Sequence, residues 1–184
     1  MKTPQAILFC AIIFSVTCLA QPQSIDDPRK QCSFSITAGR FGSDDGLGVE
    51  FGTPSLFANR LSLRMKANTV WLESHKDATS QRARYQAVGA SLVYNVAMVK
   101  RSMFYTELGS QVIFPNAEFS NESRVPAWYI LTGLDVFFKL TSHVKFTYFF
   151  AGGVISSGAH AEKIEGSPHY ADGFLFSNGL RVYF

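Results

Sequence analysis

From about residue 33 to the last residue, the chain alternates between large apolar side chains and polar or small ones with a period of two. Phe34, Ile36 and Ala38, for example, are separated by Ser35 and Thr37. This periodicity is typical of β-strands that have two unlike faces. It predicts eight strands, which cover approximately residues 34–39, 47–52, 61–71, 87–94, 104–114, 128–140, 145–154 and 174–184. Most approach the ~9–11 residues that a tilted strand needs to cross a bilayer.

The two faces of these strands differ in a way that indicates their orientation. One face is almost entirely large and apolar, whereas the other mixes glycine with charged residues of both signs. We expect the apolar face to contact lipid and the charged face to line a narrow lumen, where opposite charges pair because an unpaired ion in a confined site costs several kcal/mol. The residues predicted to form ion pairs in the lumen are Glu50, Arg64, Lys66, Glu107, Asp135, Lys139, Lys145 and Arg181.

The connections between the predicted strands alternate in length. Short connections cover residues 53–59, 95–101 and 141–143, and longer polar ones cover residues 73–82, 115–126 and 157–172. The short connection at 42–46 departs from this rule. In a bacterial membrane barrel, long loops lie outside the cell and short turns lie in the periplasm, so both chain ends are expected on the periplasmic side.

Aromatic residues occur near the predicted strand ends. Aromatic girdles at both membrane interfaces have this distribution, although aromatic residues also favour strands for their own packing reasons. The predicted girdle residues are Trp71, Tyr94, Phe104, Trp128 and Tyr148.

The first residues have the pattern of a secretory signal peptide. Lys2 precedes an uncharged apolar run that ends at Cys18-Leu19-Ala20, and a polar segment that contains Pro22 follows. We predict a signal peptide at 1–20 with cleavage after Ala20, and a periplasmic segment at 21–32. A membrane anchor or a lipoprotein fits less well, because the run is short for a spanning helix and the residues before Cys18 are a poor lipidation signal. After cleavage, Cys32 would be the only cysteine that remains in the chain, so it could form no intramolecular disulfide, and its role is open.

Composition narrows the classes of protein further. The chain has 184 residues, of which 47% are hydrophobic, 14% aromatic and 17% charged, with a formal net charge of +3. The length fits one domain, the aromatic content excludes a disordered chain, and the small charge gives no indication of nucleic-acid binding. The longest later stretch without charged residues or histidine, 146–159, contains three glycines, so we predict no transmembrane helix.

The last eight residues carry the most specific motif. Ser177, Gly179, Val182 and the terminal Phe184 resemble the assembly signal at the end of bacterial outer-membrane barrels, while Asn178 is unusual at a lipid-facing position. The chain is thus similar to the small OmpX, Ail and OmpA-membrane-domain group and to the broader outer membrane protein β-barrel domain family. The resemblance implies an all-β, antiparallel, eight-stranded up-and-down barrel over 33–184 in a Gram-negative outer membrane. It also implies a monomer that contacts lipid and lipopolysaccharide, and that uses periplasmic chaperones and the barrel-assembly machinery during biogenesis.

Candidate chemistry is sparse. An outer-membrane lipid A deacylase of the PagL type needs a serine two residues after its histidine, whereas the segment His169-Tyr170-Ala171-Asp172 has alanine there. We therefore predict no catalytic residues and no cofactor. The side chains of His160, Glu162, Glu165 and His169 share one loop and could gather a metal ion, but scattered polar residues in a loop are more often solvated, so no metal site is predicted.

The expected function is that of a non-enzymatic integral membrane protein. An eight-stranded barrel encloses only enough space for its own side chains, which argues against a wide pore. We expect the loops, above all 157–172, to serve surface interaction or envelope integrity. The alternatives are a lipid A-modifying enzyme, a narrow channel and a soluble barrel of the lipocalin type. The last of these would place Phe104, Leu134, Phe150 and Val182 in a central core. No specific ligand, host partner, ion conduction or source species follows from the sequence.

Overall fold

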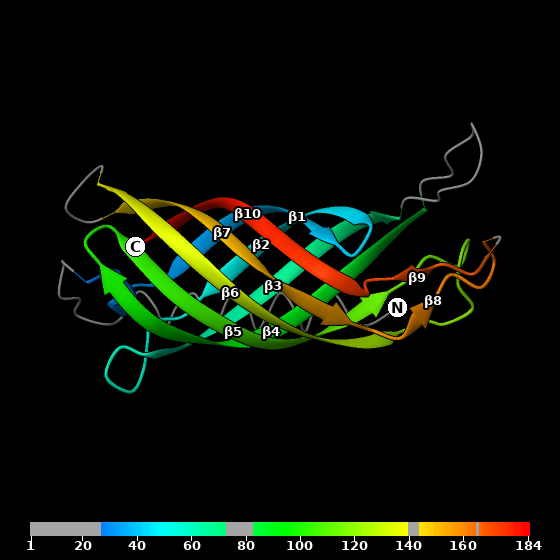
Figure 1. The fold of residues 1–184 in the computed structure, drawn as a ribbon, viewed down its shortest axis with the longest axis horizontal. Helices are drawn as coiled ribbons and strands as arrows, with labels where there is room; N and C mark the ends of the chain where they lie inside the picture. The colour runs from blue at the N-terminus through cyan, green and yellow to red at the C-terminus, as the bar shows by residue number, and fades with distance from the viewer. Residues whose placement is uncertain (1–26, 73–82, 140–143, 165) are drawn as a thin grey trace.

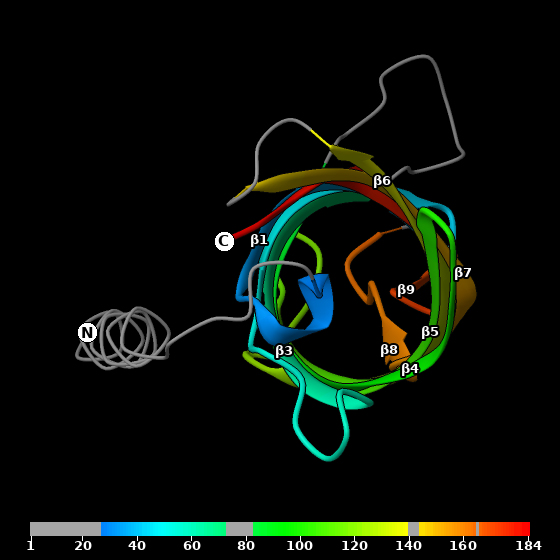
Figure 2. The ribbon, with the colours of Figure 1, turned by 90° about the vertical axis from the view of Figure 1, so that its left-hand side faces the viewer.

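The computed structural model describes residues 27–72, 83–139, 144–164 and 166–184. Long tilted strands form a single closed cylinder, seen from the side in Figure 1 and along its axis in Figure 2. The predicted signal peptide at 1–20 and the predicted connections at 73–82 and 141–143 lie outside the described residues.

The barrel has the strand order β1-β10-β7-β6-β5-β4-β3-β2, and β2 pairs with β1 to close it. Every neighbouring pair is antiparallel. The predicted antiparallel, eight-stranded, up-and-down barrel is therefore confirmed. Its strands are β1 (Ser33–Phe41), β2 (Asp44–Gly52), β3 (Leu61–Leu72), β4 (Ala83–Val99), β5 (Ser102–Phe114), β6 (Val125–Lys139), β7 (Lys145–Ser156) and β10 (Gly173–Tyr183).

The two faces of the sheet are inverted relative to a soluble protein. Phe104 and Phe150 are 42% and 44% exposed on the outer wall, whereas Glu107 and Arg181 are fully buried. Because side chains alternate along a strand, one register fixes this arrangement for the whole chain. The soluble-barrel alternative required an apolar centre and solvated charges, and the structure contradicts it.

The ends of the barrel are different. The terminal end carries residues 27–32, the 53–60 connection, the tight turn at 100–101 and the last residue, whereas the loop end carries the 42–43 turn and the connections 115–124 and 157–172 (Figure 1). Among the described residues, no helix is both long and apolar enough to cross a membrane.

Two predicted connections differ from the structure. The connection expected at 95–101 is a two-residue turn, because β4 continues through an irregularity at Asn95 and Ala97 to Val99. The connection at 157–172 was expected to be a surface loop, but it contains β8 (Ala159–His160) and β9 (His169–Tyr170), which pair as a hairpin. In Figure 2 this hairpin lies within the outline of the barrel.

The segment before β1 is ordered against the terminal end. A short 3-10 helix, η1 (Pro28–Lys30), begins after Asp27, whose side chain accepts a hydrogen bond from the Arg29 amide. The Arg29 carbonyl in turn accepts a hydrogen bond from Ser55 in the β2–β3 connection. Cys32, which directly precedes β1, is disulfide-bonded in this full-length chain. The expectation that Cys32 has no cysteine to pair with applies only to the chain after cleavage of the predicted signal peptide.

Candidate functional site

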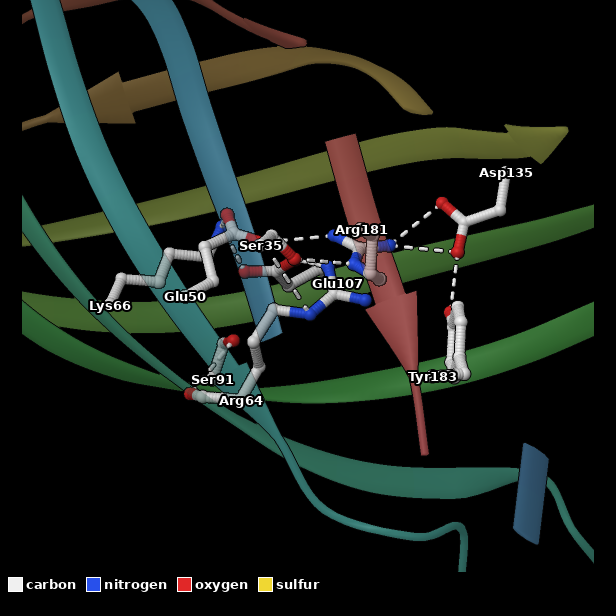
Figure 3. Close-up of polar contacts among 9 residues, drawn as sticks. All are labelled: Ser35, Glu50, Arg64, Lys66, Ser91, Glu107, Asp135, Arg181 and Tyr183. Atoms are coloured by element: carbon white, nitrogen blue, oxygen red, sulfur yellow. Dashed lines mark hydrogen bonds and ion pairs between the residues drawn. The ribbon is translucent and has the colours of Figure 1, made fainter. Parts of the chain in front are cut away.

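A network of charged side chains crosses the lumen of the barrel (Figure 3). Its residues lie in the halves of their strands that are nearer the terminal end. Arg181 on β10 is its most connected member. Its guanidinium donates to Asp135 on β6 at 2.7 Å and to Glu50 on β2 at 2.8 Å, while its Nε donates to Ser35 on β1 at 2.8 Å. Tyr183 donates from its hydroxyl to the same Asp135 carboxylate at 2.6 Å. These bonds connect strands on different sides of the cylinder.

A second set of pairs continues the network on β3 and β5. Glu107 lies 2.7 Å from Arg64 Nη1 and 2.6 Å from Lys66 Nζ, and Lys66 also lies 3.1 Å from Glu50. The three cations Arg64, Lys66 and Arg181 therefore balance the three carboxylates of Glu50, Glu107 and Asp135. Charge balance of this kind is required where water is excluded, because a single unpaired charge would be strongly destabilising.

Aromatic rings enclose these charges. The Arg181 guanidinium lies 4.3 Å from the centre of the Phe149 ring, Arg64 lies 4.8 Å from Tyr105, and Lys66 lies 5.0 Å from Tyr129. Cation–π contacts are stronger where the groups are buried from solvent, as these are. The rings thus fill the space between the ion pairs and add to their stabilisation.

Glycines on the lumen face make room for two of these rings. Tyr105 is opposite Gly133 across β5 and β6, and Tyr129 is opposite Gly109. A methyl group added to either glycine would overlap the tyrosine ring that lies over it. The small residues of the polar face are therefore required by packing, in agreement with a lumen filled by side chains.

The half of the lumen nearer the loop end is filled differently. Inward-facing residues here are mostly apolar, and the space is closed by Tyr170 of the β8–β9 hairpin and by Phe119 of the 115–124 connection. The ring centres of Phe119 and Tyr170 are 5.2 Å apart, and those of Tyr85 and Tyr170 are 5.4 Å apart. The hairpin is also fixed by hydrogen bonds from Ser157 to the Tyr170 carbonyl at 2.7 Å and from the Ala171 amide to Asp44 at 3.4 Å.

The cavity that remains at the terminal end is small and polar. It holds about 20 Å³ and is lined by η1, the β2–β3 connection and Arg64. This volume is on the scale of one buried water molecule. Within the described residues, the lumen is therefore filled by ion pairs in one half and by rings in the other.

Two of the predicted lumen charges lie at the terminal ends of their strands. Lys145 is half-buried at the first position of β7, at the terminal end of the barrel. Lys139 ends β6 opposite Lys145, and its side chain lies outside the described part of the chain. The network also contains two residues that the prediction omitted, Ser35 and Tyr183. Both occupy inward positions of the same alternation, so the pattern could have identified them.

The predicted girdle residues fall at both ends of the outer wall. Trp71 and Trp128 lie towards the loop end, on β3 and β6 respectively, whereas Tyr94, Phe104 and Tyr148 lie towards the terminal end, on β4, β5 and β7. Tyr94 accepts a hydrogen bond from Arg60 at 2.8 Å. Rings with a polar partner at the strand ends suit the boundary between lipid and water.

The C-terminal motif follows the same division between the faces. Ser177 and Gly179 are on the inner side of β10, while Val182 is on the outer side and exposed Phe184 directly follows the strand. Phe184 exchanges two backbone hydrogen bonds with Cys32, at 3.0 and 3.1 Å, so the end of the chain is paired with the start of the barrel. Asn178 accepts a hydrogen bond from Tyr148 at 3.0 Å, which gives this polar residue a partner on the outer wall.

Two histidines of the 157–172 connection lie opposite each other in the β8–β9 hairpin. His160 and His169 are exposed and face each other across the hairpin with ring centres 4.0 Å apart, and His169 is 4.0 Å from Asp172. Tyr170 and Ala171 are buried in the lumen. Among the described residues, no group of three or more potential metal ligands is present, and Glu165 lies outside them.

Comparisons with known proteins find similarity among solved structures. No protein-family model and no curated protein matches the chain. Among solved structures, the chain is similar to the outer membrane protein OprG from Pseudomonas aeruginosa. The two share 13% sequence identity with a TM-score of 0.44, and the match covers 84% of this chain and 96% of that one.

Proposed function

We propose that this chain is an integral outer-membrane protein whose barrel is sealed, and which acts through its outer wall and loop end rather than through its lumen. The observation that carries the proposal is the inversion of the two faces. Large apolar side chains such as Ile36 and Leu108, which are 63% and 60% exposed, cover the outside, while the charged residues of the central network, such as Glu107 and Arg181, are buried. In water this surface would be an aggregation hazard, whereas in hydrocarbon it is the favourable arrangement.

The topology supports an orientation in that membrane. Residues 27–32 and Phe184 lie at the same end of the barrel as the tight turn at 100–101. A chain delivered from the periplasm and inserted with an even number of strands has this arrangement. The loop end would then face the outside of the cell.

The filled lumen supports a role without diffusion through the barrel. An ion that passed along the axis would have to displace Arg181 from Asp135 and Glu50 and expose those carboxylates without their partner. That change costs several kcal/mol. The hairpin and Phe119 would have to move as well.

The residues also support a non-enzymatic role. At the histidine motif, Ala171 is present where a deacylase of this architecture requires a serine, and it is buried under the hairpin rather than on the lipid-facing wall. A function in envelope integrity or surface interaction uses what the barrel offers instead, which is a rigid apolar wall and an ordered outer end.

Location and folding can be tested together with the full-length chain in a Gram-negative host. We expect the protein to sediment with outer membranes and, after detergent extraction, to migrate faster on a gel when it is not heated than when it is boiled. Recovery in the soluble fraction would contradict the proposal.

Conduction is tested separately by recording from planar lipid bilayers that contain the purified protein. We expect no stepwise currents, even at high protein load. Reproducible single-channel steps would overturn the sealed barrel and favour the narrow-channel alternative.

A further inference from the structure

A row of outward-facing polar residues crosses four adjacent strands at the loop end of the outer wall. The register pairs Arg40 on β1 with Asp45 on β2, Asp45 with Trp71 on β3, and Trp71 with Arg84 on β4. Three steps between strands, each about 4.8 Å, place the Cα atoms of the two arginines about 14 Å apart. Trp71 therefore lies between two positive charges, at the height where the wall meets the lipid headgroups.

These arginines differ from the cations of the lumen. Arg40 and Arg84 are both exposed, and neither forms an ion pair or a side-chain hydrogen bond with any residue in the described part of the chain. Asp45, between Arg40 and Trp71, is exposed as well. Two guanidinium groups that have no ion-pair partner among the described residues, at a membrane boundary, are suited to bind phosphate groups, which accept two parallel hydrogen bonds from each arginine.

The wall below this row is hollowed. Three adjoining hollows of about 440, 600 and 720 Å³ descend from Arg40 and Trp71 towards the middle of the barrel. The two lower hollows border Ala67, and the largest also borders Ala90; these outward residues of β3 and β4 are short where other strands carry phenylalanine or leucine. Such hollows have the apolar character to hold acyl chains.

Polar side chains line the upper part of the hollows. Thr69 and Gln86 are opposite each other on β3 and β4, directly below Trp71 and Arg84. Both border the hollow of about 600 Å³. On a wall that is otherwise apolar, such groups favour a ligand with hydroxyl or amide groups between its charged head and its chains.

We propose that this face binds one molecule of a glycolipid that carries two phosphates and several acyl chains, as the lipid of the outer leaflet does. Arg40 and Arg84 hold the phosphates, Trp71 packs against the sugars, and the hollows over β3 and β4 receive acyl chains. The orientation of this face towards the outer leaflet rests on the proposed function. Binding of the glycolipid to the protein in detergent does not depend on that orientation, so the binding site and the proposed function can be disproved separately.

The test uses the protein folded in detergent micelles with a Trp128→Phe substitution. The chain has two tryptophans, so this change leaves Trp71 as the only one. Trp71 emission is titrated with bisphosphorylated, hexa-acylated lipid A, with its dephosphorylated form, with phosphatidylglycerol and with inorganic phosphate. We expect the bisphosphorylated lipid to bind about tenfold more tightly than the other lipids, and phosphate alone to cause no change.

The matched variants remove two exposed positive charges from opposite ends of the barrel. We expect Arg40→Gln/Arg84→Gln to weaken lipid A binding about tenfold and to abolish the preference for the phosphorylated form. Lys100→Gln/Arg101→Gln, at the terminal end, should leave both unchanged. Gel mobility without heating shows that each variant is folded.

Three other outcomes of the titrations would contradict the inference. Equal losses in the two double variants would show that net charge alone attracts the lipid. Unchanged binding in Arg40→Gln/Arg84→Gln would mean that the face contacts only ordinary boundary lipid, and a response to inorganic phosphate would identify a free-anion site. A protein that fails to reach the outer membrane, but binds lipid A as described, would contradict the proposed function and leave this site intact.

Discussion

The two halves of the lumen solve the same packing problem with different chemistry. Near the terminal end, side chains from the strands themselves fill the cylinder, and Arg181, Asp135 and Glu50 hold one another across it. Near the loop end, Phe119 and Tyr170 enter from connections between strands and pack as rings against Tyr85. Loss of Arg181 therefore leaves buried charges in the first half, whereas loss of the Phe119 ring leaves only an empty space in the second.

The largest effect is expected where a buried charge loses its partner. Arg181→Met leaves the Asp135 carboxylate without its cation and removes one of the three cations that lie within 4 Å of Glu50. We expect it to lower the free energy of unfolding by about 3–5 kcal/mol. Urea unfolding of the detergent-folded protein, followed by tryptophan emission, measures this difference. Arg124→Met is the control, because Arg124 is exposed. Within the described part of the chain its guanidinium contacts only the Phe114 ring, whose centre is 5.9 Å away, and this contact is worth about 1 kcal/mol or less.

A double variant separates the charge from the packing of Arg181. Arg181→Met/Asp135→Leu leaves Arg64 and Lys66 with Glu50 and Glu107, so the remaining network is neutral again. We expect it to recover much of the stability that the single variant loses. If the double variant is no more stable than Arg181→Met, the importance of Arg181 lies in its packing rather than its charge.

In the other half, Phe119→Ala removes a ring without leaving an ion unpaired. We expect it to lower the free energy of unfolding by about 1.5–3 kcal/mol and to increase proteolysis of the β8–β9 hairpin. Because the charged network is intact, bilayers that contain this variant should stay silent. Currents in Phe119→Ala would show that the rings, and not the ion pairs, close the barrel. His160→Ala, on the exposed side of the same hairpin, is the control and should change neither property.

A smaller effect is expected from a methyl group added beneath a lumen ring. In Gly133→Ala the new Cβ overlaps Tyr105, and a shift of the ring should cost about 1–3 kcal/mol. Gly152→Ala is the matched control, because its nearest neighbour is Phe174 at 3.7 Å, an ordinary contact distance. Equal stability of the two variants would show that the Tyr105 ring can move freely.

The difference between the halves also explains how much could be predicted from the sequence. The barrel and the charged network depend on strand residues, and the period of two assigns Glu50, Glu107 and Arg181 to the inner face wherever the strands are in register. The alternation does not predict which charges pair with one another, because it assigns a residue to a face but not to a position around or along the cylinder. Lys145, for example, is on the inner face but lies at the end of β7.

The ring-filled half could not be predicted in the same way. Phe119 and Tyr170 belong to connections that have no periodicity, and only the closed barrel provides the space into which they fold. The β8–β9 hairpin consists of two residues on each side, which is too short for an alternation to be recognised. The row from Arg40 to Arg84 was missed for a related reason, because its residues become neighbours only through pairing across four strands.

The smallest expected effect concerns the segment that covers the terminal end, and it depends on pH. Burial on its own would raise the pKa of Asp27, but hydrogen bonds from Arg29 outweigh it and hold the pKa below the ordinary value of 3.8. A lowered pKa in the folded state stabilises the protein at neutral pH, and this contribution is lost as the pH falls below 3.8 through the lowered value. Because the pair is partly exposed, Asp27→Asn should cost less than about 1 kcal/mol at pH 7. Its difference from the wild type should vanish in acid. In an Arg29→Gln background, which keeps the backbone amide donor but loses the guanidinium, the difference should be smaller. A difference that persists in acid, where the Asp27 carboxyl is protonated, would show that the charge of Asp27 is not what stabilises this segment.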